Sequence, residues 1–485
     1  MTTPLLHFID GSWIEGAGEE IVDENPSRPD DIVASGRAAT TPDVERAITA
    51  AARAGKAWAA TPAQERAAVL LRAAAIVERH IPDWGEELSR EEGKTLVEGR
   101  GEVFRSAEIL RYFAHESERE QGELFASSRR GERILVVRRP VGVIAVITPF
   151  NFPIAIPVWK IAPALVTGNT VVWKPATVVP LLAMRFAQAL EEAGLPPGVL
   201  SLVIGSPSVG QALVSHPRVD AVTFTGSTAV GRGIAAELAG RGVPFQGEMG
   251  GKNASVVLAD ADLDLAVEQV ALGAFRATGQ KCTATSRVVV HDAVADEFIE
   301  RFAARARAIV VGESIDPASD MGPVIDGRAK SNLQAAVSRA VSEGVQPIVL
   351  PETYESGLLA DGHFIAPTVF ALAEGGPDEL WRRELFGPVV GIRRATSTDH
   401  AMDLVNDSEY GLSAAVFTRD LGRALAAIDD VRVGVLHVNS ESAGADPHVP
   451  FGGTKGSGLG PKEQGGVARD FFTETTTVYL RGGDA

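Results

Sequence analysis

Cysteine is almost absent from this sequence: Cys282 is the only one among 485 residues. A single cysteine excludes an internal disulfide and a metal centre built from several thiolates.

Positive charge is in deficit as well. The sequence has 46 Lys and Arg against 63 Asp and Glu, a net charge of −17, which disfavours nucleic acid and anionic membranes as partners.

Long hydrophobic runs are also missing, because the most apolar stretch, residues 141–166, contains Asn151, Lys160 and four prolines. The first residues, MTTPLLHFIDGSW, lack the basic and apolar parts of a secretory signal. We therefore expect a cytoplasmic protein.

Short apolar strands alternate with helices through the middle of the chain, which is the pattern of a doubly wound parallel sheet. The expected strands are 143–147, 170–173, 202–204, 221–224 and 256–258. Before them, a helix is expected over 41–60, a second capped by Thr61 with Pro62 at its first position, and two more to about residue 120. We interpret the charged faces of these helices as solvent-exposed and without a site.

The alternation repeats from 254 to about 440, with a strand at 287–291, a helix to about 311 and another at 327–342, which predicts a second α/β domain. Two β runs, 133–139 and 475–480, stand apart from both domains. They are expected to pair as an arm whose edge invites another subunit, with an ordinary edge hairpin as the alternative.

Ligands of such sheets bind at the carboxyl ends of the strands. Thr148, Lys174, Gly205 and Gly226 each lie where an expected strand ends. A lysine there suits a ribose or a phosphate, and Gly226 with Ser227 at a helix start could hold a diphosphate. Surface lysines and Gly–Ser turns also occur without a ligand, so these residues alone leave both interpretations open.

Cys282 lies in a polar stretch, next to Lys281 and three residues after Gly279. The glycine lets the backbone present a side chain into a cleft, and the cation favours the thiolate. A lone cysteine is equally often a small buried hydrophobe, so this stretch supports both roles equally.

Seven motifs follow one another along nearly the whole chain: TPFNFP (148–153), WKPA (173–176), FTGS (224–227), EMGGKN (248–253), GQKCTA (279–284), ELFGPV (384–389) and PFGG (450–453). In order and spacing they resemble the aldehyde dehydrogenase superfamily. The resemblance implies an α/β fold with a Rossmann-like NAD(P)-binding domain (1–120 and 141–250), an α/β catalytic domain (251–440), a small β oligomerisation arm (121–140 and 466–485) and a return segment near the active site (441–465). It also implies a homodimer or homotetramer.

The resemblance assigns roles to individual residues. Cys282 would attack the aldehyde as a thiolate, and the Asn151 amide with the Cys282 backbone N–H would hold the oxyanion. After hydride transfer to the nicotinamide, Glu248 would activate the water that hydrolyses the thioester, which favours an acid product over transfer to coenzyme A. Lys174 and Glu384 resemble the ribose contacts, Ser227 the diphosphate contact, and Phe386 would lie near the nicotinamide. No metal is required.

One departure concerns the cofactor. Many NAD-specific members carry glutamate at the position of Thr177, where the carboxylate repels a 2′-phosphate. Threonine is neutral and can donate to phosphate, so we expect NADP to be accepted alongside NAD.

Within the superfamily, residues 150–165, 279–287 and 443–465 are similar to α-ketoglutaric semialdehyde dehydrogenases, and less closely to succinate semialdehyde dehydrogenases. Arg276 lies where semialdehyde enzymes often bind a carboxylate, although an arginine that caps the preceding helix is the alternative. Trp159 stands where succinate semialdehyde enzymes can carry another arginine, and it could pack against an aliphatic or aromatic aldehyde. We expect a short carboxylated semialdehyde as the substrate. A broad-range aldehyde dehydrogenase and an inactive cofactor-binding homologue remain the alternatives.

Overall fold

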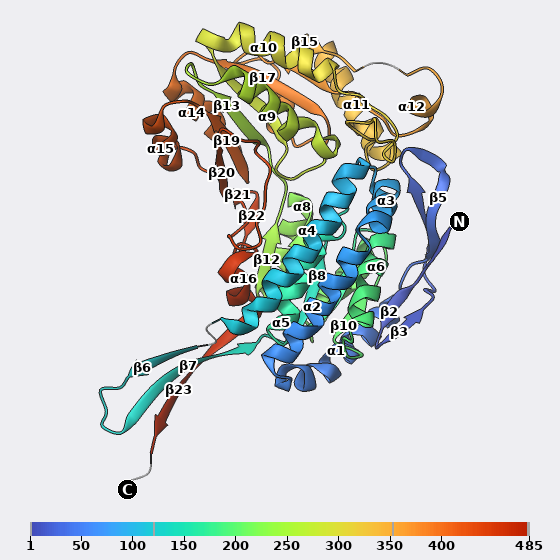
Figure 1. The fold of residues 1–485 in the computed structure, drawn as a ribbon, viewed down its shortest axis with the longest axis vertical. Coiled ribbons are helices and arrows are strands. Elements are labelled where there is room, and N and C mark those ends of the chain that lie inside the picture. Colours follow the sequence, from blue (N-terminus) through green and yellow to red (C-terminus); the bar gives the residue numbers. More distant parts are fainter. Residues whose placement is uncertain (1, 120–121, 352–353, 483–485) are drawn as a thin grey trace.

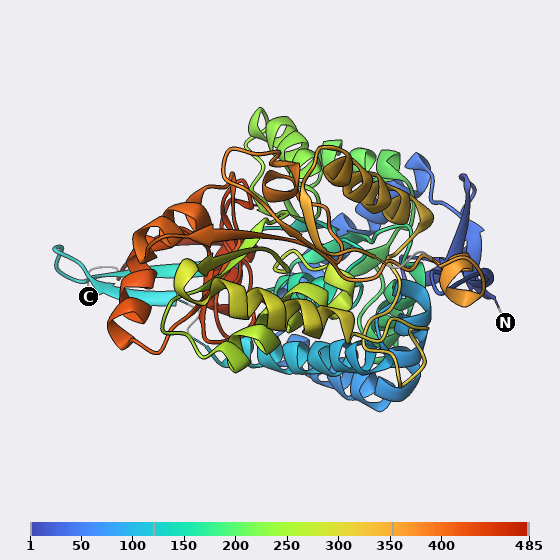
Figure 2. The same cartoon turned by 90° about the horizontal axis from the view of Figure 1, so that it is seen from above.

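Two large sheets, each covered by helices, and a protruding three-stranded arm make up the fold of this computed structural model (Figure 1). The structure describes residues 2–119, 122–351 and 354–482. Residues 1, 120–121, 352–353 and 483–485, which fall within the predicted domain and arm ranges, lie outside the described residues. In both views the arm and the N-terminal strands lie at opposite ends of the molecule (Figure 2).

The first sheet has eight strands in the order β22-β12-β11-β8-β9-β10-β2-β3. Its five central strands are parallel: β8 (Val143–Ile147), β9 (Thr170–Lys174), β10 (Leu200–Leu202), β11 (Ala221–Thr225) and β12 (Phe245–Glu248). The strands β2 (His7–Ile9), β3 (Ser12–Ile14) and β22 (Gly458–Leu459) add to its edges in antiparallel fashion. The predicted parallel sheet is confirmed, but its third strand begins two residues earlier than expected and β12 was not foreseen.

Helices cover both faces of this sheet, which explains why its five central strands are buried at nearly every position. One face is covered by α1 (Thr41–Ala60), α7 (Pro207–Ser215) and α8 (Thr228–Ala239). The other is covered by α2 (Ala63–Arg79), α3 (Ile81–Glu92), α4 (Leu96–Ala114), α5 (Ala155–Val166) and α6 (Pro180–Glu192). The predicted cap at Thr61 is wrong, because its hydroxyl donates back to the carbonyl of Ala57 at 3.1 Å and α2 begins after Pro62.

The second sheet has seven strands in the order β15-β16-β17-β14-β13-β19-β20. They are β13 (Asn253–Val257), β14 (Thr285–His291), β15 (Gln346–Val349), β16 (Thr368–Ala371), β17 (Val389–Ala395), β19 (Ser413–Phe417) and β20 (Val435–Val438), and all but β15 run parallel. One face packs against α9 (Leu263–Phe275) and α10 (Asp292–Arg307), and the other against α11 (Gly327–Ser342), α13 (Glu379–Arg382), α14 (Thr398–Asn406) and α15 (Leu421–Asp430). The strand expected at 256–258 belongs to this sheet, as β13.

The arm is an antiparallel sheet of β6 (Gly122–Ala126), β7 (Glu132–Pro140) and β23 (Thr473–Arg481). Its two long strands are the isolated β runs of the sequence, and they pair from Thr473 with Pro140 to Arg481 with Glu132. The predicted pairing is therefore confirmed.

Smaller elements complete the chain. A three-stranded sheet is formed by β1 (Thr3–Leu5), β4 (Glu20–Asn25) and β5 (Arg28–Arg37), and single-turn helices occur at His115–Glu118, Arg276–Gly279 and Leu358–Asp361. Between β20 and the arm the chain crosses from one large sheet to the other: β21 (Thr454–Lys455) pairs with β18 (Tyr410–Gly411), β22 pairs with β12, and α16 (Gly465–Phe472) packs on α5. Among the described residues, no helix is long and apolar enough to span a bilayer.

Candidate active site

The five central strands of the first sheet end at one common edge. Thr148, Lys174, Gly226 and Glu248 lie at the ends of β8, β9, β11 and β12, and Gly205 lies three residues beyond β10. Because these strands are parallel, the structure brings together along this edge the residues that the sequence singled out separately.

Short hydrogen bonds fix the segments after β8, β9 and β10. The Thr148 hydroxyl accepts from the indole of Trp173 at 2.9 Å, and the Thr177 hydroxyl donates to the carbonyl of Gly205 at 2.7 Å. Lys174 is buried and donates to the carbonyl of Pro175 at 3.0 Å, and burial lowers its pKa to about 8. It meets no carboxylate among the described residues, so its charge remains available to a ligand.

Gly226 and Ser227 form the turn that leads from β11 into α8. The Gly226 N–H donates to the carbonyl of Glu248 at 3.1 Å, and Ser227 is exposed at the N-cap position of α8. A helix start with free backbone N–H groups favours an anion such as a diphosphate.

The loop 384–389 of the second sheet reaches across to this edge. Glu384 accepts from the Gly251 N–H at 2.8 Å, and burial raises its pKa to about 7. Phe386 has a φ of 59°, in the left-handed region, and its ring lies edge-on to Phe150 with centroids 5.7 Å apart. The loop is thereby held against the motif that also carries Asn151.

Cys282 follows a tight turn between α9 and β14. Ala277, Thr278 and Gly279 all have positive φ, and a Cβ on Gly279 would lie 2.5 Å from the carbonyl oxygen of Gly387. The side chain of Asn253 donates to the carbonyl of Cys282 at 2.7 Å. Only a glycine fits at position 279. The turn presents a partly exposed cysteine on the wall of a cavity.

Burial raises the pKa of the Cys282 thiol to about 12, and the carboxylates of Glu384, Glu248 and Glu463 add to the shift. The expectation that Lys281 favours the thiolate is wrong for this structure. Its ammonium group lies 3.5 Å from Glu441, and burial lowers its own pKa.

Glu248 is buried and accepts from the Gly453 N–H at 3.0 Å. Its pKa is raised well above the usual range, mainly by burial and then by Glu463. The neighbouring Gly452 has a φ of 153°, and a Cβ there would lie 2.1 Å from the Glu248 carboxylate. The PFGG motif is thus shaped around this glutamate.

Glu463 is a site residue that the sequence analysis missed. It accepts from the indole of Trp159 at 2.6 Å and forms a buried ion pair with Lys160, which also donates to Thr223 at 2.9 Å. The segment was recognised only as a return to the active site, because a glutamate in a Gly-rich stretch shows no pattern that predicts burial.

Asn151 is buried, and its side-chain amide has no hydrogen-bond partner among the described residues. Its carbonyl accepts from Lys94, which forms an ion pair with Glu102 at 2.7 Å. Glu102 in turn accepts from the backbone N–H groups of Ile154 and Ala155, both at 3.1 Å. The prediction that the early helices carry no site is therefore wrong, since α4 anchors the segment that holds Asn151.

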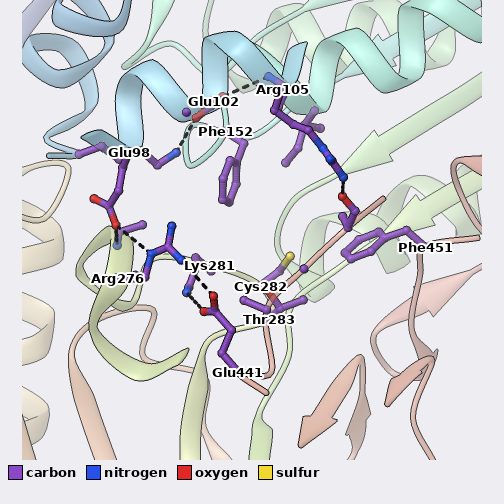
Figure 3. Close-up of a pocket in the computed structure, with 18 of the residues that line it drawn as sticks. Glu98, Glu102, Arg105, Phe152, Arg276, Lys281, Cys282, Thr283, Glu441 and Phe451 are labelled. Carbon is purple, nitrogen blue, oxygen red and sulfur yellow. Dashed lines mark hydrogen bonds and ion pairs between the residues drawn. The ribbon is translucent and has the colours of Figure 1, made fainter. Parts of the chain in front are cut away.

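A cavity of about 340 Å³ opens beside Cys282. Its walls come from α4, α5, residues 276–283 and residues 441–451, and the apolar part includes Phe152, Trp159 and Phe451. Figure 3 shows Arg276 between Glu98 and Glu441. The Arg276 guanidinium lies 3.8 Å from the Glu98 carboxylate and 3.0 Å from that of Glu441, so Arg276 forms ion pairs with two carboxylates of the cavity lining.

The structure thus groups the predicted residues into two sets. Cys282, Arg276 and Trp159 line the cavity, with Asn151 and Glu248 close to it, whereas Lys174, Thr177, Gly205, Gly226 and Ser227 follow the sheet edge. No group of three or more His, Cys, Asp or Glu side chains among the described residues is arranged to hold a metal ion.

The sequence model described as "Aldehyde dehydrogenase family" matches residues 13–478. The chain belongs to the aldehyde dehydrogenase family. A relative named alpha-ketoglutaric semialdehyde dehydrogenase, from Bacillus subtilis, is 42% identical over 480 residues, covering 98% of each chain. A relative named 2,5-dioxopentanoate dehydrogenase, from Saccharolobus solfataricus, is 39% identical over 96% of this chain and 97% of its own.

Among solved structures of this family, the betaine aldehyde dehydrogenase of Staphylococcus aureus in complex with NAD+ superposes with a TM-score of 0.94. It is 32% identical, and the match covers 98% of this chain and 94% of that one. The fold of this aldehyde dehydrogenase, including its two α/β bodies and its arm, is therefore that of the family.

Proposed function

We propose that this protein oxidises an aldehyde irreversibly to a carboxylic acid, with NADP or NAD as the hydride acceptor and Cys282 as the nucleophile. The observation that carries the proposal is the position of Cys282. It lies on the wall of the cavity, and Glu248 is near enough to affect its pKa. Family membership supports the same reaction class.

The residues divide the steps between them. The Cys282 thiolate attacks the carbonyl carbon, and the Asn151 amide with the Cys282 N–H stabilises the oxyanion. Collapse of the oxyanion releases hydride to the cofactor and leaves a thioester on sulfur. Glu248 then takes a proton from water, and the water oxygen bonds to the acyl carbon. The carbon–sulfur bond breaks, sulfur leaves as the Cys282 thiolate, and the acid is released.

The residues along the sheet edge fit NAD(P), which supplies the hydride acceptor when bound. Ser227 and the start of α8 would hold the diphosphate. Lys174, without a carboxylate partner in the described chain, would bind the adenosine ribose, with Thr177 beside it. Glu384 would accept from the second ribose and Phe386 would orient the ring. Thr148, Gly205 and Gly226 would shape the edge against which the cofactor lies.

For the substrate we propose a short carboxylated semialdehyde such as α-ketoglutaric semialdehyde, with Arg276 near its distal carboxylate and Trp159 against its chain. The names of the two relatives support this choice. A broad-range aliphatic or aromatic aldehyde is the second candidate. It is favoured by the apolar wall of Phe152, Trp159 and Phe451, and by the carboxylates that already flank Arg276.

We further propose a homodimer or homotetramer in the cytoplasm. The arm carries exposed apolar side chains at Leu124, Tyr479 and Leu480, and β23 leaves an open sheet edge. The helix α15 also exposes Leu421, Leu425 and Ile428, beside the edge strand β20. Apolar surface next to unpaired strand edges is typical of subunit contacts.

The test is a set of initial rates of NADPH and NADH formation with α-ketoglutaric semialdehyde, succinate semialdehyde, an aliphatic aldehyde and benzaldehyde, with Arg276→Ala measured beside the parent. A large preference for the semialdehydes that Arg276→Ala removes supports the carboxylated substrate. Equal rates with uncharged aldehydes, unchanged in the variant, favour the broad-range enzyme. If no aldehyde gives turnover although cofactor binds, the chain is an inactive homologue.

A further inference from the structure

One face of α4 forms a side of the substrate cavity. Val97, Glu98, Gly101, Glu102 and Arg105 line it at the spacing of successive helical turns. A Cβ built on Gly101 has no atom within 4 Å, so the space between Glu98 and Arg105 along this face is open.

Two of the three charged residues on this face are already committed to the fold. Glu98 accepts from the backbone N–H and hydroxyl of Thr95, the N-cap residue of α4, and from the N–H of Ala277 at 2.8 Å. Glu102 pairs with the buried Lys94. Arg105 is different, because within the described part of the chain its side chain bonds only to the loop that carries Ala445 and Asp446.

The two arginines of the cavity differ in how firmly their partners are held. Arg276 is flanked by Glu441 and Glu98, whose side chains are only 19% and 12% exposed, and Glu441 also attracts Lys281. Arg105 meets Asp446 at 2.8 Å, and the Asp446 side chain is 60% exposed. An exposed ion pair contributes little net free energy, so Asp446 can turn into water at small cost.

We propose that Arg105 is a specificity-determining residue that receives the distal carboxylate of the substrate, displacing Asp446. This inference rests on the proposed aldehyde oxidation and refines its substrate class: the contact with the distal carboxylate passes from Arg276, which is already paired with Glu441 and Glu98, to Arg105. In Figure 3 Arg105 and Arg276 lie on opposite sides of Phe152. A semialdehyde whose carbonyl carbon is at Cys282 extends along the open groove at Gly101 toward the guanidinium of Arg105, which forks onto a carboxylate.

The test compares succinate semialdehyde with butanal, an uncharged aldehyde with the same number of carbons. Arg105→Ala is expected to lower the ratio of kcat/KM for succinate semialdehyde to kcat/KM for butanal by about tenfold or more. The change should come from a higher KM for the semialdehyde, because a charge-assisted hydrogen bond to its carboxylate is lost. Arg105→Lys should restore part of the ratio, since it keeps the charge without the fork. Arg100→Ala is the matched control: it removes the same charge from the same helix, at an exposed residue beside Gly85 and outside the cavity lining.

Asp446→Asn distinguishes substrate recognition by Arg105 from a purely structural contact between Arg105 and the loop. If Asp446 competes with the substrate, this variant keeps or raises the preference for succinate semialdehyde over butanal, whereas Arg105→Ala lowers it. If Arg105 only ties the loop to α4, both variants slow both aldehydes alike, and the inference is overturned. An unchanged ratio in Arg105→Ala also overturns it, as does a parent enzyme that oxidises butanal but not the semialdehyde. A parent that oxidises no aldehyde refutes the proposed function itself, and the inference with it.

Discussion

The indole N–H of Trp159 donates to Glu463 over 2.6 Å, while the next residue, Lys160, pairs with the other oxygen of the same carboxylate. Two donors therefore hold one buried carboxylate in place. Its charge helps to raise the pKa of Glu248, the proposed base. The pH range in which Glu248 can accept a proton thus depends on a residue outside the cavity lining.

Replacement of Glu463 by Gln should shift the acid limb of the pH dependence of kcat to lower pH. The variant removes the negative charge that raises the pKa of Glu248, so the base stays ionised in more acidic solution. It also leaves Lys160 without its carboxylate, and we expect a loss of stability of about 3 kcal/mol, visible as a lower thermal midpoint. Trp159→Phe keeps the charge of Glu463 and serves as the control. An acid limb that stays in place would show that Glu463 does not act on the base.

Replacement of Glu248 by Gln should separate hydride transfer from hydrolysis. Attack by Cys282 and hydride transfer do not need the glutamate, so a rapid burst of reduced cofactor is expected. Steady-state turnover should fall by about 100-fold or more, the range of a lost general base. Stopped-flow absorbance followed by steady-state rates measures both. A steady-state rate equal to that of the parent would remove Glu248 from the mechanism.

Alkylation of Cys282 should respond to the redox state of the cofactor. Burial raises the pKa of the thiol to about 12, so without added cofactor the rate of iodoacetamide labelling should still be rising at pH 10. The nicotinamide ring of an oxidised cofactor is positively charged and should lower that pKa, moving the rise in labelling to lower pH. The reduced cofactor, whose ring is neutral, is the matched control, and Cys282→Ser gives the background. Identical profiles with oxidised and reduced cofactor would contradict this.

Replacement of Thr177 by Glu should turn the enzyme toward NAD. The Thr177 hydroxyl is tied to the carbonyl of Gly205, at the place where we expect the adenosine ribose. A carboxylate there repels a 2′-phosphate, so the NADP/NAD ratio of kcat/KM should fall by about tenfold or more. Thr177→Val keeps the shape without charge or hydroxyl and shows how much of the effect is charge. A ratio unchanged by Thr177→Glu would place the 2′-phosphate elsewhere.

Much of the fold follows from the sequence alone because local signals are strong. The helix at 327–342 matches α11, since Asp326 caps it by accepting from the Ala329 N–H at 2.6 Å and its apolar positions recur on one face. The strand at 143–147 matches β8, since an unbroken apolar run suits a strand buried on both faces. The motifs at strand ends could likewise be placed on one edge.

The remainder could not be predicted because it depends on contacts between distant segments. The charged residues of α4 look solvent-exposed in the sequence, and only the fold shows Glu102 buried under residues 154 and 155. Lys281 is adjacent to Cys282 in sequence, yet its side chain turns to Glu441, 160 positions further on. Adjacency along the chain gives no direction for a side chain, which is why the expected effect on the thiol failed.

Different positions in and just before α4 have different contacts. Lys94, just before it, and Glu102 fasten the backbone around Asn151, whereas Val97, Gly101 and Arg105 face the cavity and support none of these bonds. The residues that hold the Asn151 segment in place are therefore distinct from the residues of α4 that face the proposed substrate. A library varied only at positions 97, 101 and 105 would explore new aldehydes while leaving the nucleophile and the oxyanion site intact.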